Sequence, residues 1–322
     1  MSDSGHQPLP YASVMQEPVL SVVVPVYNGK RYILDTLASL ASLEDILPCE
    51  VIFQNARSTD GTTEILDNFC QGRGNRHHFN EQDSGQSEAI NAGLARARGR
   101  WVTWLCADDL VLPDLARALA EGDRVGADVV YGDVIFIQGP HAFPAEGTEV
   151  YSPGVLAKRR LVIQQPGTCI QRAAWNVFGG VDPSRNWAMD YDLFLRLESA
   201  GRNFYRSSSF LAVIRVHTDA KTSSGSHKRV LELWSILWQS HCRRPAYFRP
   251  RPYFVYGVEF VIKFLEAGRA AGKKFPPRAV LALLHRFFWL AARSREKELI
   301  RQRFQELPQE TRMLLAGLTQ NP

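Results

Sequence analysis

The sequence lacks the cysteine patterns that mark a disulfide framework or a zinc site. Its five cysteines are odd in number and widely spaced, and no two of them form a C-x-x-C pair. Structural zinc knuckles and disulfide-stapled miniproteins need paired or closely spaced cysteines, so neither class fits this chain. This cysteine usage favours a reducing compartment, and we therefore expect a cytoplasmic protein.

Long apolar runs and a leader are also missing. A transmembrane helix needs about 20 apolar residues, and the nearest candidate, 279–292, is interrupted by His285 and Arg286. Residues 1–17 show no basic start followed by an apolar stretch. We therefore expect a disordered N-terminal arm in place of a signal peptide.

Two glycine-rich phosphate-binding motifs are absent as well. No G-x-G-x-x-G follows the first predicted strand, and G-x-x-x-x-G-K-[ST] occurs nowhere. Dinucleotide-binding proteins and P-loop proteins cradle phosphates with those loops. A nucleotide bound by this chain must be held in another way.

The composition is that of a globular protein with a large core. The 322 residues are 45% hydrophobic, which predicts roughly two domains. From 19 to 216, short β-branched runs alternate with helical patterns, which is typical of an α/β domain with a mostly parallel sheet. We place this domain at 18–224. Its predicted strands include 20–26, 50–53, 101–106 and 127–134, and its predicted helices include 86–98 and 190–200.

Residues 225–322 read as a separate, basic helical extension. Residues 242–322 hold 16 Lys and Arg against 6 Asp and Glu, a net charge of +10, whereas the chain as a whole carries +5. With the aromatic cluster at 287–289, this charge supports the hypothesis that the extension lies peripherally on the anionic inner face of a membrane. Packing on the α/β domain, or a dimer contact, is the alternative. Because no nucleic-acid-binding module accompanies the charge, we expect no nucleic acid partner.

Several residues lie at the ends of predicted strands or shortly after them, where open α/β sheets bind ligands. These residues are Pro25, Tyr27, Asn28, Asn55, Asp60, Asp108 and Asp109. Asn28 is also placed to cap the helix that follows the first strand. The hard oxygens of Asp108 and Asp109 suit a divalent cation, Mg²⁺ or Mn²⁺, that bridges a diphosphate. Capping of a helix that begins near Pro113 is the alternative role of this pair.

Five segments occur in one order along the predicted domain. They are SVVVPVYNG (21–29), STDGT (58–62), DSGQSEAINAGLARARG (83–99), WLCADD (104–109) and GGVDPSRNWAMDYDLFLRL (179–197). Together they resemble a family 2 glycosyltransferase of the GT-A fold, and the resemblance extends from about Val19 to Thr222. It implies a nucleotide-sugar donor, an aspartate-bound cation, inversion at the anomeric carbon, and a glycan or lipid-linked acceptor in bacterial surface polysaccharide assembly.

The resemblance also assigns the nucleotide-binding residues. Pro25, Tyr27 and Asn28 match the segment that lines the base and ribose pocket, and Asp83 matches a position beside the nucleotide. Asn55 stands where the family usually carries an aspartate that contacts the base, and its amide can still read a base edge. Ordinary turn chemistry is the alternative for each of these residues.

The cation site keeps only part of the family pattern. Asp108 matches the second acid of the D-x-D motif, with Asp109 beside it, but Cys106 replaces the first acid. The Cys106 thiol is either a soft ligand or a packing residue. His217 resembles a histidine that completes the metal shell in some members, although an isolated histidine is often a structural hydrogen bonder.

Displacing a nucleoside diphosphate from a sugar requires a base for the acceptor hydroxyl. Asp190 in MDYDLFLRL matches the base position of the family. At a helix N-terminus its carboxylate is favoured in the ionised form, so we expect an unshifted pKa of about 4. The alternative is a helix-capping aspartate, with Asp192 as the base. Trp187 is a candidate to stack on an acceptor sugar.

Two other functions fit parts of the sequence. Asn55 and Cys106 are compatible with a degenerate fold that binds a sugar nucleotide or a partner without turnover. A metal-dependent nucleotidyltransferase is the other reading, and the lack of a glycine-rich loop after the first strand counts against it.

Overall fold

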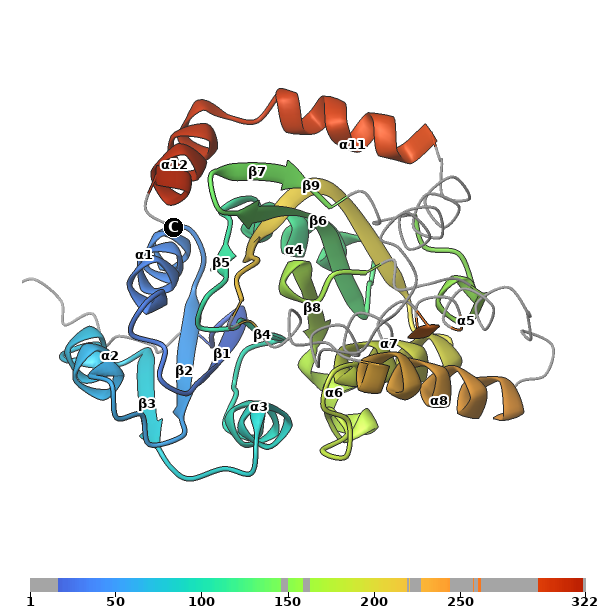
Figure 1. Ribbon diagram of the computed structural model, residues 1–322, viewed down its shortest axis with the longest axis horizontal. Coiled ribbons are helices and arrows are strands. Elements are labelled where there is room, and N and C mark those ends of the chain that lie inside the picture. The colour runs from blue at the N-terminus through green and yellow to red at the C-terminus, as the bar shows by residue number, and fades with distance from the viewer. Residues whose placement is uncertain are drawn as a thin grey trace, which may run out of the picture.

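Strands and helices alternate along the first half of the chain, as the hydrophobic pattern predicts, in the computed structural model shown in Figure 1. It describes residues 17–145, 150–158, 163–218, 220, 227–243, 257, 260, 261 and 295–320. The elements up to the fifth strand are β1 (Leu20–Val26), α1 (Ile33–Glu44), β2 (Cys49–Asn55), α2 (Thr62–Cys70), β3 (Arg76–Asn80), α3 (Gln86–Ala95), β4 (Trp101–Trp104) and β5 (Leu110–Val111).

The second half adds longer strands and the C-terminal helices. Its elements are α4 (Asp114–Arg124), β6 (Val129–Gln138), β7 (His141–Pro144), α5 (Val155–Lys158), the 3₁₀ turn η1 (Gln165–Gly167), β8 (Thr168–Gln171), α6 (Arg172–Phe178), α7 (Met189–Ser199), β9 (Phe204–Arg215), α8 (His227–Arg243), α11 (Arg295–Gln305) and α12 (Gln309–Gln320).

One mixed sheet of nine strands forms the centre of the described part of the chain. Its order is β3-β2-β1-β4-β8-β6-β9-β5, with β7 paired to β6. β3, β2, β1 and β4 run parallel to one another, whereas β8 is antiparallel to both β4 and β6. β9 returns parallel to β6. The parallel arrangement predicted for the sheet therefore holds from β1 to β4, and the tight turn between β6 and β7 forces an antiparallel pair beyond it.

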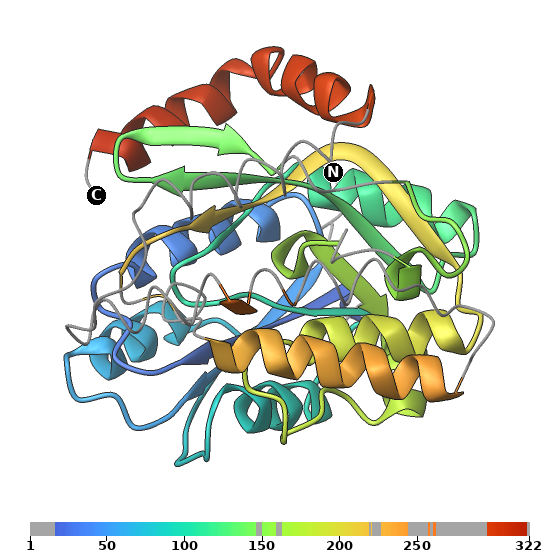
Figure 2. The same ribbon diagram turned by 45° about the vertical axis from the view of Figure 1, so that its right-hand side comes forward.

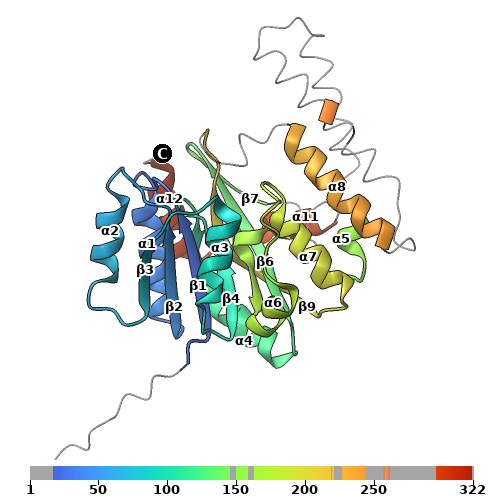
Figure 3. The same ribbon diagram turned by 90° about the horizontal axis from the view of Figure 1, so that it is seen from below.

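Helices cover both faces of the sheet, so most side chains of the central strands are buried and apolar (Figure 3). In β1, Val22 and Val24 join the core beneath α1, α2 and α4, while Val23 faces α3, α6 and α7. Alternation of side chains along a strand produces this division. A strand buried on both faces reads as a continuous apolar run, which is why LSVVVPV is recognisable in the sequence.

The basic extension packs against the α/β domain at two separate places (Figure 2). α8 lies beside α7 and adds four buried apolar residues to the core on that side, namely Val230, Leu233, Ile236 and Leu237. α11 and α12 cross β6 and β7, where they bury Ile300, Leu307, Leu315 and Leu318. The aromatic cluster at 287–289 lies outside the described residues. None of the described helices has the length and apolarity needed to cross a bilayer.

The segment after β4 differs from the predicted strand and cap. β4 ends at Trp104, because the chain turns at 106–109 and the amide of Asp109 donates a hydrogen bond to the carbonyl of Cys106 at 3.1 Å. β5 then separates this turn from α4. The idea that Asp108 and Asp109 cap the helix near Pro113 is therefore wrong.

Candidate active site

Asn28 joins the loops that follow β1 and β2. Its backbone amide donates to Ser58 Oγ at 2.8 Å, and its side-chain Oδ1 accepts from the amide of Thr59 at 2.9 Å. A φ of 50° places it in the left-handed region, which asparagine tolerates better than most residues. The predicted capping role is wrong, because α1 begins only at Ile33, after an intervening turn.

Asn55 supports the β2 loop from beneath. It has no exposed surface. Its Oδ1 accepts hydrogen bonds from the Ser58 amide (3.1 Å) and hydroxyl (2.6 Å), and its Nδ2 lies 3.0 Å from Thr63 Oγ1 and 3.2 Å from His78 Nε2. This differs from the expectation that Asn55 itself reads a base edge. Because the strand extends to Asn55, the side chain is enclosed by the loop that it holds.

The remaining predicted nucleotide contacts lie near the same strand ends. Tyr27 is 68% exposed, and Pro25 is half-buried within β1. Asp83 precedes α3, and its Oδ1 accepts a hydrogen bond from the Gly85 amide at 2.9 Å. Burial and the charge of Glu88 raise the Asp83 pKa. Within the described part of the chain, no hydrogen bond joins Asp83 to the loop that Asn28 holds.

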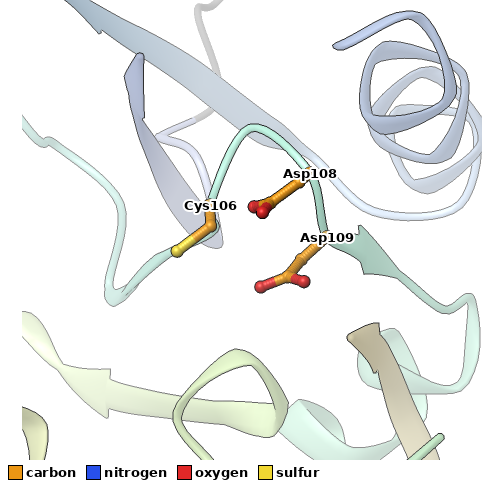
Figure 4. A group of neighbouring side chains, drawn as sticks. All are labelled: Cys106, Asp108 and Asp109. Carbon is orange, nitrogen blue, oxygen red and sulfur yellow. The ribbon is translucent and has the colours of Figure 1, made fainter. Parts of the chain in front are cut away.

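Cys106, Asp108 and Asp109 form a compact group of ligand atoms. Their sulfur and carboxylate oxygens lie within 4.8 Å of one another, and Figure 4 shows the two carboxylates directed to the same side of the loop. Asp108 Oδ2 is 2.8 Å from His217 Nε2. Since His217 follows β9, this contact unites the two strand ends that the sequence predicted to carry metal ligands.

Asp109 anchors the loop from inside. It is 5% exposed, and its Oδ1 accepts a hydrogen bond from the Arg215 amide at 3.1 Å. Burial, together with the charge of Asp108, raises the Asp109 pKa well above its ordinary value. This carboxyl is therefore better placed to hold the loop against β9 than to carry a negative charge toward a ligand.

The geometry of Asp108 and His217 fits a divalent cation. Adjacent ligands of an octahedral ion with bonds of about 2.1 Å lie about 3 Å apart, and the oxygen and nitrogen of this pair are separated by 2.8 Å. His217 Nδ1 is buried without a hydrogen-bond partner in the described structure. The Tyr32 ring packs against the imidazole with the ring centres 4.6 Å apart. Tyr32 and Arg215, which shape this site, carry no sequence signal that marks them.

Asp190 is the second residue of α7, at the N-terminus as predicted. Its Oδ1 accepts a hydrogen bond from the Tyr191 amide at 2.8 Å. Burial nevertheless raises the pKa of Asp190 to about 6. The expectation of an unshifted pKa is wrong, because the loss of hydration outweighs the stabilisation that the helix N-terminus gives to the carboxylate.

The neighbouring candidate has a different environment. Asp192 forms an ion pair with Arg196 one helical turn later, with 2.8 Å between Oδ2 and Nε. The negative charge of Asp192 is therefore paired with a positive charge on the same helix. Trp187 precedes α7, and its indole Nε1 is buried with no hydrogen-bond partner in the described structure.

One turn of α3 contacts both the loop 106–109 and the start of α7. Gln86 Nε2 donates to the Cys106 sulfur at 3.3 Å, beside Asp108. The hydroxyl of the next residue, Ser87, lies 2.9 Å from the Met189 sulfur, beside Asp190. The same turn of α3 thus contacts both the loop 106–109, called the cation loop below, and the start of α7.

The sequence model described as glycosyl transferase family 2 matches residues 21–175. Residues 21–175 belong to glycosyltransferase family 2. The match includes the β1 and β2 loops and the cation loop, but it ends before Asp190 and His217. The family match therefore does not cover those two residues, and their roles are treated below as proposals.

Relatives and a solved structure agree with this family. An uncharacterized glycosyltransferase of Rickettsia typhi is 26% identical over 244 residues, which are 70% of this chain and 72% of the relative. The hyaluronan synthase of Pasteurella multocida is 24% identical over 206 residues, 61% of this chain but only 20% of the synthase. The mannosyltransferase PcManGT from Pyrobaculum calidifontis, solved with GDP-Man and Mn²⁺, superposes with a TM-score of 0.54 and 19% identity, covering 98% of this chain and 90% of that one. The chain is a glycosyltransferase with the GT-A fold.

Asn91 of α3 joins this helix to the segment that precedes α7. The Asn91 side chain donates to the Val181 carbonyl at 2.8 Å and accepts from the Val181 amide at 3.0 Å. It thereby fixes the start of the loop that leads to α7.

A cavity of about 580 Å³ lies elsewhere in the glycosyltransferase. It is lined by Tyr151, Gly154 and residues 198–204, at the C-terminal end of α7. Asp190 is at the other end of that helix, so this cavity is separate from the site.

Proposed function

We propose that this glycosyltransferase moves a sugar from a nucleoside-diphosphate sugar to a hydroxyl of a bacterial surface glycan or glycolipid, with inversion at the anomeric carbon. The observation that carries the proposal is the contact of one turn of α3 with both the cation loop and the helix that bears Asp190. The similarity of this chain to a hyaluronan synthase supports a surface-glycan product. The solved neighbour, which contains GDP-Man and Mn²⁺, supports the donor class.

The donor nucleotide is assigned to the ends of β1 and β2. Tyr27 offers an exposed ring beside Asn28, and Pro25 is half-buried two residues earlier in β1. Aromatic faces stack on bases, so Tyr27 is suited to hold the base. Asn55 acts through Ser58, whose hydroxyl it fixes. Asp83, just before α3, is the last of the proposed nucleotide-binding residues.

Asp108 and His217 are the proposed ligands of a divalent cation, Mg²⁺ or Mn²⁺, and Asp109 holds their loop in place. Such a cation supplies Lewis-acid stabilisation to the diphosphate leaving group. A hard carboxylate and a neutral imidazole form a donor set that Mn²⁺ accepts readily. Cys106 weakens the site relative to a D-x-D motif, because a thiol is a poorer partner for a hard cation.

Asp190 is the proposed base. The acceptor oxygen forms a bond to the anomeric carbon, the bond from that carbon to the diphosphate oxygen breaks, and the hydroxyl proton passes to the Asp190 carboxylate. With a pKa of about 6, this carboxylate is largely ionised at pH 7.5. It is also a stronger base than an ordinary aspartate, because its proton affinity is higher.

The acceptor is proposed to be glycan or lipid-linked, with residues 225–322 resting on an anionic membrane surface at its cytoplasmic face. The net charge of +10 in 242–322 supports this location. Sedimentation of the whole chain with vesicles tests it. We expect binding to phosphatidylglycerol vesicles at 50 mM NaCl, weaker binding at 500 mM, and none to phosphatidylcholine. Equal recovery in the supernatant with both lipids at 50 mM overturns the membrane assignment.

The transfer function is tested with a panel of UDP- and GDP-linked sugars in the presence of Mn²⁺. We expect one donor to raise the melting temperature and to be broken down slowly to its nucleoside diphosphate. Asp190→Ala is expected to keep donor binding but to lose transfer by at least about 100-fold, while Asp192→Asn serves as the control on the same helix. Asp108→Ala is expected to weaken Mn²⁺ and donor binding together. Undiminished transfer by Asp190→Ala removes Asp190 from the mechanism.

A further inference from the structure

α8 presents a polar stripe to the loop that precedes the proposed base. Glu232, Ser235 and Gln239 recur at helical spacing, and each forms a hydrogen bond with residues 185–188. The neighbouring apolar stripe of the helix is buried in the core. α8 is therefore placed firmly enough for its polar stripe to act on the loop.

Glu232 makes the most concentrated of these contacts. Its Oε1 accepts hydrogen bonds from the amides of Trp187 (3.0 Å) and Ala188 (2.8 Å), and its Oε2 accepts one from the amide of Asn186 (3.1 Å). Hydrogen bonds to a charged acceptor are stronger than those between neutral groups. Ala188 is the N-cap of α7 and has no side chain able to cap it. The carboxylate from α8 therefore pairs with the amides of the N-cap and of the two residues before it.

The same loop is held on its other side by α3. Ser87 Oγ donates to the Arg185 carbonyl at 3.0 Å, while the Arg185 guanidinium reaches Ser235 Oγ (2.9 Å) and Gln239 Oε1 (3.1 Å). Residues 185–188 are thus fixed between α3 and α8. Asp190 lies two residues beyond the last amide that Glu232 binds, so the direction of its carboxylate depends on this loop.

We propose that Glu232 is a positioning residue of the transfer reaction: by binding the amides of 186–188, it sets the orientation in which Asp190 meets the acceptor hydroxyl. This inference rests on the proposed role of Asp190 as the base. It assigns part of the active site to α8, which lies in the extension and outside the family match at 21–175.

Glu232 also has an electrostatic effect on Asp190. Burial is the main cause of the raised Asp190 pKa, and the charge of Glu232 raises it further, whereas the charge of Arg229 on the same helix lowers it. On the side of α3, the residue that packs against the start of α7 is Ser87, which contacts Met189 and carries no charge. Removing the Glu232 charge is therefore expected to lower the Asp190 pKa.

The test compares wild type, Glu232→Ala and Glu232→Gln, with Leu231→Ala as the control. Leu231 is the adjacent residue on α8 and is 47% exposed. Glutamine keeps one acceptor oxygen but no charge, so it should retain part of the contact. Hydrogen exchange of the peptide that covers 183–190 reports on the loop without any need for turnover.

We expect exchange in that peptide to be at least tenfold faster in Glu232→Ala than in wild type, and unchanged in Leu231→Ala. With the donor found by the panel, kcat should fall about 10- to 100-fold in Glu232→Ala and less in Glu232→Gln, while the KM for the donor stays within threefold. The apparent pKa of kcat should move down in Glu232→Gln. A residue needed only for folding would not separate kcat from KM in this way.

The outcomes distinguish this inference from the proposed function. Equal exchange in wild type and Glu232→Ala, or an unchanged kcat, overturns the positioning role while leaving transfer intact. Full activity of Asp190→Ala, or no transfer by wild type with any donor of the panel, overturns the proposed function instead, and the positioning role then falls with it.

Discussion

At the scale of single residues, burial decides the chemistry of Asp190. A carboxyl whose folded pKa is about 6 is mostly protonated at pH 5 and mostly ionised at pH 7. Only the ionised form accepts a proton from the acceptor. We therefore expect kcat/KM to rise about tenfold between pH 5 and pH 7. A profile already flat at pH 5 would contradict the raised pKa.

The same burial means that the ionised Asp190 carboxylate lowers the free energy of unfolding. Its folded pKa of about 6 lies above its ordinary value of 3.8, so stability falls as the pH rises from about 4 to about 6, and the full penalty is present above that range. Below about pH 4 the carboxyl is protonated in both states and the penalty is absent. We expect Asp190→Asn to raise the free energy of unfolding by about 1–3 kcal/mol at pH 8 and to leave it nearly unchanged at pH 4, as measured by urea denaturation. Asp192→Asn, which loses an ion pair, should show no such gain.

Cys106 offers a second residue-level test. An aspartate there would place a third carboxylate in a group whose ligand atoms lie within 4.8 Å of one another. Without a cation these charges repel, whereas a bound cation is held more tightly by the added oxygen. We expect Cys106→Asp to lower the melting temperature in EDTA and to show a larger rise than wild type on addition of Mn²⁺. Cys242→Asp, at an exposed thiol on α8, is the control and should respond to Mn²⁺ as wild type does.

At the scale of elements, the site depends on two helices that hold the loop between them. α3 touches the cation loop through Gln86 and the α7 loop through Ser87, while α8 binds the same loop through Glu232. Neither helix supplies a predicted ligand or base. Both determine where those groups lie, because the loop 179–188 has little secondary structure of its own.

Asn91 tests the contribution of α3. Replacing it with alanine removes both hydrogen bonds to Val181 and leaves a partly buried amide and carbonyl unpaired. We expect Asn91→Ala to lower the free energy of unfolding by about 1–3 kcal/mol. Asn68→Ala, at an exposed position on α2, should change it by less than about 0.5 kcal/mol. Equal effects in urea denaturation would show that the Val181 contact adds nothing.

At the scale of the whole molecule, the C-terminal helices share a core with the sheet. Ile300 of α11 is fully buried beside Ile135 and Leu110, and Arg303 pairs with the buried Asp133 at 2.8 Å. The division into 18–224 and 225–322 therefore describes the sequence better than it describes the packing. We propose that the two segments unfold together.

Ile300→Ala tests that proposal. The substitution leaves a cavity in the shared core, and we expect a loss of about 2–4 kcal/mol in one cooperative transition. Leu299→Ala, where the side chain is 50% exposed, should cost much less. Two separate transitions, with only the second segment destabilised, would show that the extension folds independently.

The sequence by itself determined the type of fold and indicated the reactive groups that we propose. Strand patterns and the order of five motifs are local, and Asp108 and Asp190 are recognisable because each follows or begins a regular element. Only the tertiary structure decided the raised pKa of Asp190, the enclosure of Asn55 and the contact of Glu232 with the α7 loop. These depend on neighbours far away in the sequence, because burial and hydrogen-bond partners are set by how the elements pack and not by the local pattern.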